Sequence, residues 1–373
     1  MRMPGRLVAF LTGLSLLLAG CWDNRPIDTR ALVLMMGVWP ATGGRVEVAM
    51  EIPTPSGLTT LTGGGTSAGS QGASAAYYVL TGTGSNVMSA LSNAESMANG
   101  DVYLGQTGMV ILSTELSPQA RKMALEALAR IGSFDKTAYL GVTESSERAF
   151  MDFTPPSSPL PALYFLNVFG CKSCMPVALD QTVWTSEQDR YTAGVSLWLP
   201  LLVPAAKGFR INQMVLFRDN RLAAILSPTA TRWLGMALGR THKAAFGVMT
   251  IFPGVPVAVR AVTAKSSPSY RMTHGQLHLR VALNLVGTVD LLPAGDATAP
   301  TIHRLDTALA RMVAHKVAHA LVLAQKLGVD PVGFGRAYLF RHPHAGREWA
   351  RLYRKAPVTV TVRAVIHNLG DLT

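Results

Sequence analysis

The alternation of apolar and polar residues predicts a β-hairpin near the beginning of the chain. Residues 29–36 are mostly apolar, and residues 45–52 carry an apolar side chain at every second position. A period of two is typical of a strand with one buried face. Thr42, Gly43 and Gly44 lie between the two segments and favour a turn. We therefore expect two antiparallel strands joined at this turn.

Short apolar runs then alternate with helical periods as far as residue 142. The runs predict strands at 77–81, 108–112 and 137–142. Ser85 is the expected N-cap of one intervening helix, and Ser117 followed by Pro118 predicts the start of the other. This order favours a sheet whose strands are connected by crossover helices.

The rest of the chain has the same mixture of patterns, with longer elements. A short helix at 145–152 and helical segments up to about residue 190 precede an apolar strand at 194–203. Beyond it, the patterns predict a hairpin with strands 211–217 and 222–226, a helix at 228–238, strands at 245–251, 255–263 and 277–291, a helix at 301–327, a helix around Trp349 and a final strand at 358–367.

These elements predict an α+β fold with two or three mixed α/β domains. We expect an N-terminal region over 21–204, made of two subdomains, and a C-terminal domain over 205–373. Residues 53–76 are rich in Gly, Ser, Thr and Pro, which is typical of a flexible insertion. A chain of 373 residues is long enough for several hydrophobic cores.

The first 20 residues have the pattern of a cleaved signal peptide. Arg2 and Arg6 precede a charge-free apolar stretch, 7–20, which is too short to span a bilayer as a helix. The stretch ends in Leu-Ala-Gly before Cys21, and this ending resembles the bacterial lipobox. That resemblance implies cleavage before Cys21 and a diacylglyceryl group on its thiol, with acyl chains such as palmitate. The alternative is an ordinary signal peptide followed by a chance cysteine.

Positive charge is concentrated in the second half of the chain. Before Pro204 there are 12 Lys and Arg against 15 Asp and Glu, whereas from Pro204 onward there are 22 against 7. A basic half suits anionic lipid headgroups or an acidic partner, and the alternative is solvated charge without function. The candidate contact residues are Lys243, Arg260, Arg271, Arg280, Arg304, Arg311 and Lys316. Nucleic acid is not an expected partner, because the sequence has no finger, zipper or RNA-binding motif.

Besides Cys21, the sequence contains Cys171 and Cys174 in a Cys-x-x-Cys spacing. Outside the cytoplasm such a pair can form a disulfide. Three interpretations of the pair stay open: a structural or incidental pair, a redox pair, or half of a metal site. No second cysteine pair and no suitably spaced histidine accompanies these two cysteines in the sequence. A disulfide between Cys171 and Cys174 is therefore one candidate feature, and we predict no metal and no cofactor.

Histidines on the long predicted helix give the nearest approach to a catalytic motif. His315 and His319 are spaced i, i+4, as in zinc-binding helices, but no Glu lies between them to act as a general base. We expect them to lie on a solvated helix face. The sequence also lacks a nucleophile elbow and a phosphate-binding loop, so we predict no catalytic residue.

Motifs spread along most of the chain resemble one known family. They are the opening Cys21-Trp22-Asp23, the helix-strand unit over 86–112, the hairpin Val215 to Leu222, the pair Gln325-Lys326, Asp330, the run Gly333-Phe334-Gly335, and the closing Trp349, Pro357 and Val358 to Val362. In this order and spacing the chain resembles the Ger(x)C family, the lipoprotein C subunit of nutrient germinant receptors in endospore-forming bacteria. The long Gly/Ser-rich stretch and the two later cysteines depart from the family pattern.

The resemblance implies a multi-domain α/β lipoprotein, usually described as three domains, without catalytic activity. It implies a position on the outer face of the inner spore membrane, together with two integral membrane subunits, of A type and B type. The alternatives from other classes are a lipid-anchored solute-binding or scaffold protein of a transporter, and an extracytoplasmic hydrolase. A solute-binding protein needs a deep cleft between similar lobes, and the two halves here are dissimilar.

Two short segments are candidate contacts with a partner or the membrane. Trp22 and Asp23 directly follow the expected lipid, and tryptophan suits the headgroup region, although a core tryptophan is equally compatible. Gly333, Phe334 and Gly335 could form a conformational joint or a partner contact. The alternative for this second segment is a loop that ends the preceding helix, with glycines at positive φ.

Overall fold

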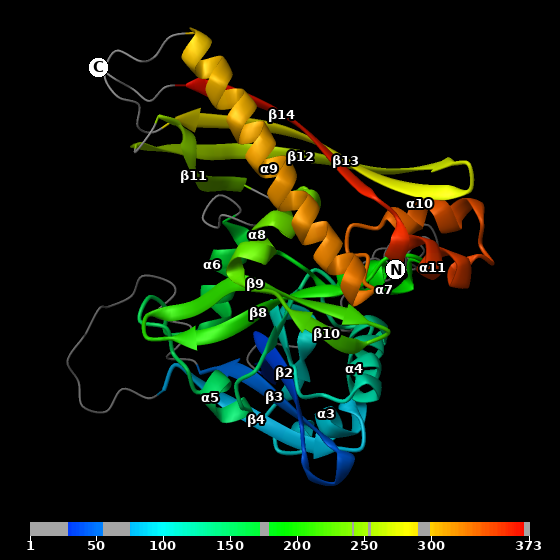
Figure 1. Cartoon of the computed structure of the whole chain (residues 1–373). Helices are drawn as coiled ribbons and strands as arrows, with labels where there is room; N and C mark the ends of the chain where they lie inside the picture. The colour runs from blue at the N-terminus through cyan, green and yellow to red at the C-terminus, as the bar shows by residue number, and fades with distance from the viewer. Residues whose placement is uncertain are drawn as a thin grey trace, which may run out of the picture.

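The computed structural model describes residues 29–54, 75–171, 179–240, 242–252, 255–289 and 299–368. Within them the chain forms a sheet of eight strands, a sheet of four strands and a pair of short strands, with helices against both large sheets (Figure 1). The α+β class expected from the sequence is therefore confirmed.

The eight-stranded sheet has a parallel centre and antiparallel flanks. In spatial order it consists of β10 (Arg221–Ile225), β9 (Gly208–Arg218), β8 (Trp198–Ala205), β7 (Tyr139–Thr143), β6 (Met109–Ser113), β2 (Met35–Pro40), β3 (Val46–Pro53) and β4 (Tyr77–Gly84). The central strands β8, β7, β6 and β2 are parallel, which requires crossover connections of the kind that the sequence predicts. The remaining short elements of this region are β1 (Arg30–Leu32), β5 (Asp101–Tyr103), η2 (Thr42–Gly44) and η4 (Leu104–Gln106).

Helices cover both faces of this sheet. One face holds α3 (Val87–Glu95), α4 (Pro118–Arg130) and α7 (Val183–Tyr191), and the other holds α5 (Glu147–Met151) and α6 (Pro161–Gly170). Neighbouring residues of β6 therefore enter different cores, since Leu112 packs with the first group of helices and Ile111 with the second. Both are fully buried, which is why this strand is a continuous apolar run in the sequence.

Side-chain caps fix where the helices of this region begin. The Ser117 hydroxyl accepts a hydrogen bond from the Ala120 amide at 3.1 Å, which confirms the predicted start of α4. The predicted cap of α3 is wrong by one residue: Asn86, not Ser85, accepts from the Ser89 amide at 3.0 Å. The Ser89 hydroxyl in turn accepts from the Asn86 amide, and this reciprocal pair decides in favour of Asn86.

The four-stranded sheet is covered by helices on one face in the described part of the chain. Its strands are, in order, β11 (His242–Phe252), β12 (Val255–Thr273), β13 (Gln276–Val289) and β14 (Val358–Asn368). Its helices are α8 (Pro228–Ala237), α9 (Ala299–Leu327), α10 (Phe334–Arg341) and α11 (Gly346–Lys355). Figure 1 shows α9, in orange, lying along this sheet.

Residues of β13 alternate strictly between the helix-covered face and the opposite face. Leu279, Val281 and Leu283 are buried in the core, whereas Arg280 and Asn284 are exposed. The alternation predicted from the sequence is confirmed. β11 to β13 are antiparallel, whereas β14 runs parallel to β13, so the connection between these two strands must return along the sheet.

The hairpin predicted at the start of the basic half belongs to the eight-stranded sheet. Asp219 and Asn220 connect β9 to β10 with φ of 50° and 61°, as a tight hairpin turn requires. Because β9 pairs with β8, the expected boundary between 204 and 205 lies inside a continuous sheet. Met214 and Leu216 of β9 share one core with the helices of the four-stranded sheet, so the two sheets are joined through that core.

Several features predicted from the sequence lie outside the described residues. These are the signal peptide over 1–20, Cys21, Trp22, Asp23, Cys174 and most of the insertion over 53–76. Among the helices that the structure does describe, none combines the length and the apolar character needed to cross a bilayer.

Candidate functional site at the junction of the two sheets

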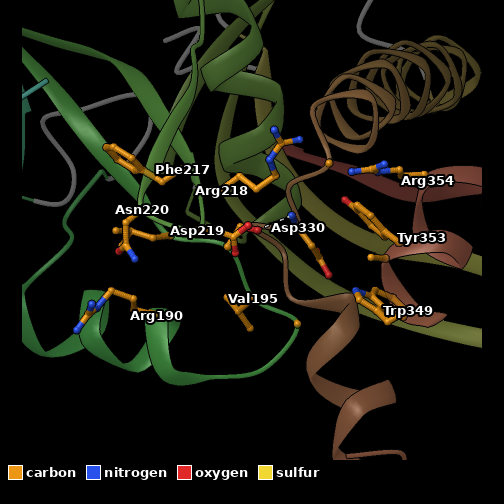
Figure 2. Close-up of a pocket in the computed structure, with 15 residues that line it drawn as sticks. Arg190, Val195, Phe217, Arg218, Asp219, Asn220, Asp330, Trp349, Tyr353 and Arg354 are labelled. Carbon is orange, nitrogen blue, oxygen red and sulfur yellow. Dashed lines mark hydrogen bonds between the residues drawn. The ribbon is translucent and has the colours of Figure 1, made fainter. Parts of the chain in front are cut away.

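A pocket of about 390 Å³ lies where the eight-stranded sheet meets the helices of the four-stranded sheet. Figure 2 shows its walls: the segment between α7 and β8, the β9–β10 turn, the loop after α9, and α11. We call it the junction pocket. Its lining residues are Arg190, Gly194 to Leu197, Phe217 to Asn220, Gly328, Asp330, Trp349, Ala350, Tyr353 and Arg354.

Two glycines bring the backbones of the two regions into direct contact beside this pocket. A Cβ atom added to Gly335 would lie 2.6 Å from Nε1 of Trp349 and 2.7 Å from Cα of Gly194. A Cβ atom on Gly194, whose φ is 77°, would lie 2.4 Å from the Gly335 carbonyl carbon. These separations are below van der Waals contact, so both positions need glycine for this approach.

Asp330 is the polar centre of the contact. Its Oδ1 accepts from the Gly333 amide and its Oδ2 from the Gly335 amide, each at 2.8 Å, so the carboxyl group holds the start of α10. The side chain is only 4 % exposed, and this burial raises its pKa to about 7, while the amide hydrogen bonds act in the opposite direction.

The Asp330 backbone binds the other region directly. Its amide donates to the Ser196 hydroxyl at 2.9 Å, and the Ser196 amide donates to the Asp330 carbonyl at 2.9 Å. This reciprocal pair connects the segment before β8 to the loop after α9. One residue therefore organises its own loop through its side chain and ties the two regions together through its backbone.

Two guanidinium groups converge over the end of α9. Arg218 donates from Nη1 to the Leu327 carbonyl at 3.3 Å. A Cβ atom on Gly328 would lie 3.2 Å from Arg354 Nη2 and 3.3 Å from Arg218 Nη1, so both groups lie against this glycine. Cations at this position complement the negative end of a helix dipole, here that of the longest described helix.

Aromatic side chains form the wall of the pocket that belongs to α11. The Trp349 and Tyr353 rings stack at 5.4 Å between centroids, and the Tyr353 hydroxyl donates to the Val329 carbonyl at 2.8 Å. Gln325 of α9 donates from Nε2 to the Tyr353 carbonyl at 2.7 Å. Burial raises the pKa of Tyr353 well above its ordinary value, so this hydroxyl stays protonated and keeps its role as a donor.

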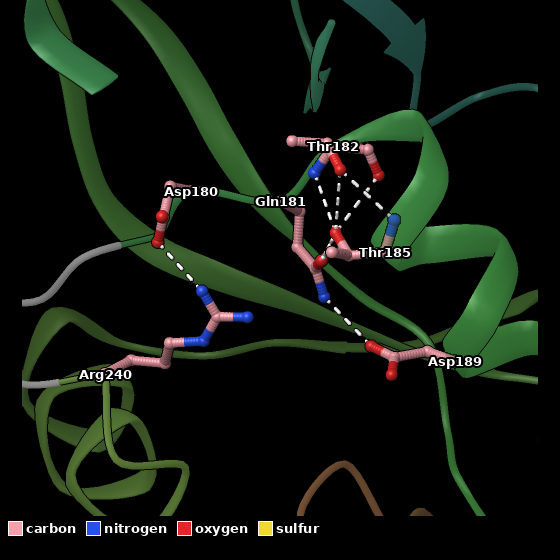
Figure 3. A network of polar contacts seen from close by, with 6 residues as sticks. All are labelled: Asp180, Gln181, Thr182, Thr185, Asp189 and Arg240. Atoms are coloured by element: carbon pink, nitrogen blue, oxygen red, sulfur yellow. Dashed lines mark hydrogen bonds and ion pairs between the residues drawn. The ribbon is translucent and has the colours of Figure 1, made fainter. Parts of the chain in front are cut away.

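A second polar network joins the regions on the far side of α7 (Figure 3). Arg240, which follows α8, donates from Nη1 to Asp180 at 3.0 Å, and its guanidinium carbon lies 5.9 Å from the centroid of the Trp198 ring. The buried Gln181 donates from Nε2 to Asp189 on α7 at 3.0 Å. Two separate sets of contacts thus fix the orientation of the four-stranded sheet against the eight-stranded sheet.

The chemistry of the junction pocket is that of a structural joint. Both oxygens of Asp330 are engaged by amides, and Arg190 is paired with Glu187 through hydrogen bonds of 2.8 and 3.0 Å. Within the described ranges, no group of three or more His, Cys, Asp or Glu side chains is arranged to hold a metal ion. His315 and His319 are exposed on α9, in agreement with the predicted solvated face.

Comparison with known protein families identifies both halves of the chain. Residues 23–204 match the family described as spore germination protein N-terminal domain, and residues 212–370 match spore germination B3/GerAC like, C-terminal. The chain belongs to the Ger(x)C family of spore germination proteins. The first match ends in β8 and the second begins in β9, so both extend into the eight-stranded sheet.

One relative and one solved structure are similar to this Ger(x)C chain over most of its length. YfkR of Bacillus subtilis (strain 168), whose name places it among spore germination proteins, is 22% identical over 376 residues, covering 96% of this chain and 94% of its own. The crystal structure of the GerBC protein superposes with a TM-score of 0.54 at 12% identity, covering 89% of this chain and 97% of the solved chain. This second likeness shows that the fold is shared.

The structure places the Ger(x)C motif at Gly333, Phe334 and Gly335 inside the molecule. Phe334 is 3 % exposed and Gly335 contacts Gly194, so neither offers the exposed surface that the predicted partner contact needs. The alternative expectation is a loop with glycines at positive φ. It is right for Gly333, whose φ is 80°, and wrong for Phe334 and Gly335, which begin α10. The physical reason is Asp330, whose carboxyl group caps this short helix.

Of the two cysteines in the predicted disulfide, the structure describes one. Cys171 follows α6 and is disulfide-bonded. Pairing with Cys174 remains a prediction. Sequence reasoning missed Gly194, Ser196 and the Arg218–Arg354 pair, because each acquires its role only from residues more than 100 positions away in the chain.

Proposed function

We propose that this protein is the lipid-anchored C subunit of a spore nutrient germinant receptor, without catalytic activity of its own. The diacylglyceryl group on Cys21 attaches the folded chain to the outer face of the inner spore membrane. There it assembles with the two integral membrane subunits, of A type and B type. The observation that carries this proposal is the family match over both halves, from residue 23 to residue 370.

The junction of the two sheets supports a role in assembly and signalling. The Gly194–Gly335 contact, the Ser196–Asp330 pair and the Asp180–Arg240 pair hold the two regions in one orientation. A subunit built in this way moves as one body, so a displacement at one surface is transmitted to the other. Such mechanical coupling suits a receptor component more than an enzyme, whose groups must converge on a reacting atom.

The anchor is tested by Cys21→Ala in the sporulating host. We expect loss of labelling by a palmitate analogue and loss of the protein from the spore membrane fraction, because two or more acyl chains supply stable attachment. Asn24→Ala, three positions further along, is the matched control and should leave both unchanged. Equal labelling of the Cys21→Ala variant would contradict the anchor.

The receptor role is tested by deleting the gene and by purification from spore membranes. Spores without the protein should fail to respond to at least one nutrient, yet still germinate by routes that bypass the receptors. The tagged protein, solubilised from wild-type spores, should carry two integral membrane proteins with it. A normal response to every nutrient, together with purification of the protein alone, would rule out this role.

A further inference from the structure

The face of the four-stranded sheet that points away from the helices is cationic. Lys265 and Arg271 lie on β12, Arg280 on β13 and Arg363 on β14, and all four side chains are exposed. In register, Ser269 is opposite Arg280, and Lys265 is opposite Asn284, which is in turn opposite Arg363. Because side chains alternate along each strand, these residues share one face, which we call the outer face.

The described carboxylates of this half of the chain all lie elsewhere. Asp219 is in the β9–β10 turn, and Asp330 is buried at the junction. Asp306 and Glu348 are on α9 and α11, which pack on the opposite side of the sheet. No described carboxylate of this half of the chain therefore neutralises the cations of the outer face, and their field extends into the solvent.

The outer face is hollowed around two of its arginines. Arg271, His278 and Arg280 line a shallow depression of about 580 Å³ together with Thr359 and Thr361 of β14. Guanidinium groups bind phosphate oxygens through paired, charge-assisted hydrogen bonds, and hydroxyl groups supply further donors. This combination of donors with no competing carboxylate suits a phosphate group.

We propose that the outer face binds the phosphate groups of anionic phospholipids, so that the four-stranded sheet lies on the membrane surface. The inference rests on the proposed anchoring at Cys21. Seven residues lie between Cys21 and Thr29, the first described residue, and the eight steps from one to the other span at most about 28 Å when extended. The tether therefore keeps the folded chain within reach of the headgroups.

The side chains of the outer face favour lipid over an acidic protein. Protein interfaces are anchored mainly by Trp, Tyr and Arg side chains, and the aromatic ones fill pockets on a partner. The described outer-face positions of β12, β13 and β14 carry Lys, Arg, Ser, Thr, Asn, Gln, His and small aliphatic residues, without Trp, Tyr or Phe. A hydroxylated, cationic surface without large aromatic side chains matches an array of phosphate groups instead.

The test uses the processed chain from residue 21 with Cys21→Ser, so that no acyl chain contributes to binding. Its partition onto phosphatidylglycerol–phosphatidylcholine vesicles is compared with that of a triple variant, Arg271→Gln, Arg280→Gln and Arg363→Gln. We expect binding of the triple variant to be about 100-fold weaker, about fivefold for each cation removed near the surface. Vesicles of phosphatidylcholine alone should bind neither chain.

A matched control removes the same net charge from the exposed side of α9, by Arg304→Gln, Arg311→Gln and Lys316→Gln. This variant should lose less than about threefold, because these positions lie across the sheet from the outer face. Equal losses for the two triple variants would overturn the proposal, and so would failure of the unsubstituted face to bind phosphatidylglycerol vesicles. Circular dichroism of both triples checks that they are folded.

Two further measurements distinguish lipid phosphate from free phosphate, and a lipid partner from a protein partner. Inorganic phosphate should displace the chain from vesicles no better than chloride at equal ionic strength; selective displacement would make free phosphate the ligand and overturn the lipid assignment. If the outer-face triple bound vesicles normally but lost the integral subunits on purification, the face would be a protein contact. Because the vesicle assay needs neither acylation nor a receptor, its outcome is independent of the proposed function.

Discussion

The eight-stranded and four-stranded sheets differ in how they use their second face. Helices bury both faces of the first, so Ile111 and Leu112 are both inaccessible although they are consecutive. The second leaves one face to solvent, and along β13 the buried Leu283 is followed by the exposed Asn284. The first sheet is therefore buried inside the protein, whereas the second packs helices on one face and exposes the other.

The placement of charge follows the same division. Glu51 of β3 is fully buried in the eight-stranded sheet, where it accepts a hydrogen bond from the Ala162 amide at 3.1 Å at the start of α6. Burial raises its pKa to about 8, while that amide lowers it. In the four-stranded sheet the described charges lie on the outer face, in water. One region therefore uses charge inside its architecture, and the other presents it outward.

Because the two sheets share a core, we expect them to unfold together in the parent chain, and Asp330→Ala should weaken this coupling. Three amides, those of Gly333 to Gly335, would lose their acceptor, so we expect the free energy of unfolding to fall by about 4 kcal/mol. Urea unfolding followed by circular dichroism should then show two transitions instead of one. Asp330→Asn, which keeps one acceptor oxygen, should lose about half as much; equal losses would mean that the carboxyl group does not hold the loop.

Consecutive alanine substitutions sharpen the contrast between the sheets. Ile111→Ala and Leu112→Ala should each lower the free energy of unfolding by about 3 kcal/mol, because both side chains are enclosed. In β13, Leu283→Ala should cost about as much, whereas Asn284→Ala should change it by less than about 0.5 kcal/mol. Thermal and urea unfolding of the four variants measure this, and a large effect at Asn284 would show that the outer face is covered.

Glu51→Gln tests the buried charge through pH. A folded pKa near 8 against an ordinary value of 4.5 means that the folded chain holds a proton that the unfolded chain has lost. Stability from this group is therefore complete below pH 4.5 and declines as pH rises toward 8. Between pH 5 and pH 7 the parent should lose about 2 kcal/mol more than the Gln variant. Parallel stability curves for the two chains would show that Glu51 does not titrate in this range.

Local signals in the sequence predicted most of the elements. Ser117-Pro118 marks the beginning of α4, Asp219-Asn220 forms the expected turn, and the alternation in β13 has the expected period. These features depend on contacts between near neighbours, which sequence patterns encode directly. The single-residue error at the α3 cap arose because Ser85 and Asn86 are both good caps, and only the reciprocal bond with Ser89 distinguishes them.

The parts that sequence reasoning missed depend on distant residues. β12 continues to Thr273 although Pro268 lies within it, because β11 pairs with β12 only as far as Thr263 and, among the described strands, the rest of β12 pairs with β13 alone. A proline is tolerated where a strand has a free edge. In the same way, the junction pocket depends on the approach of Gly194 to Gly335 and of Ser196 to Asp330, for which neither segment carries a local signal.

The parallel pairing of β14 with β13 sets the order in which the four-stranded sheet can be completed. Leu279 is opposite Val358, although α9, α10 and α11 all lie between them in the chain. A nascent polypeptide therefore waits for its final residues to emerge before β13 acquires its neighbour, and until then an unpaired edge is open to other chains. Premature termination shortly before Val358 would leave every helix encoded yet the sheet unfinished, and the product would be prone to aggregate.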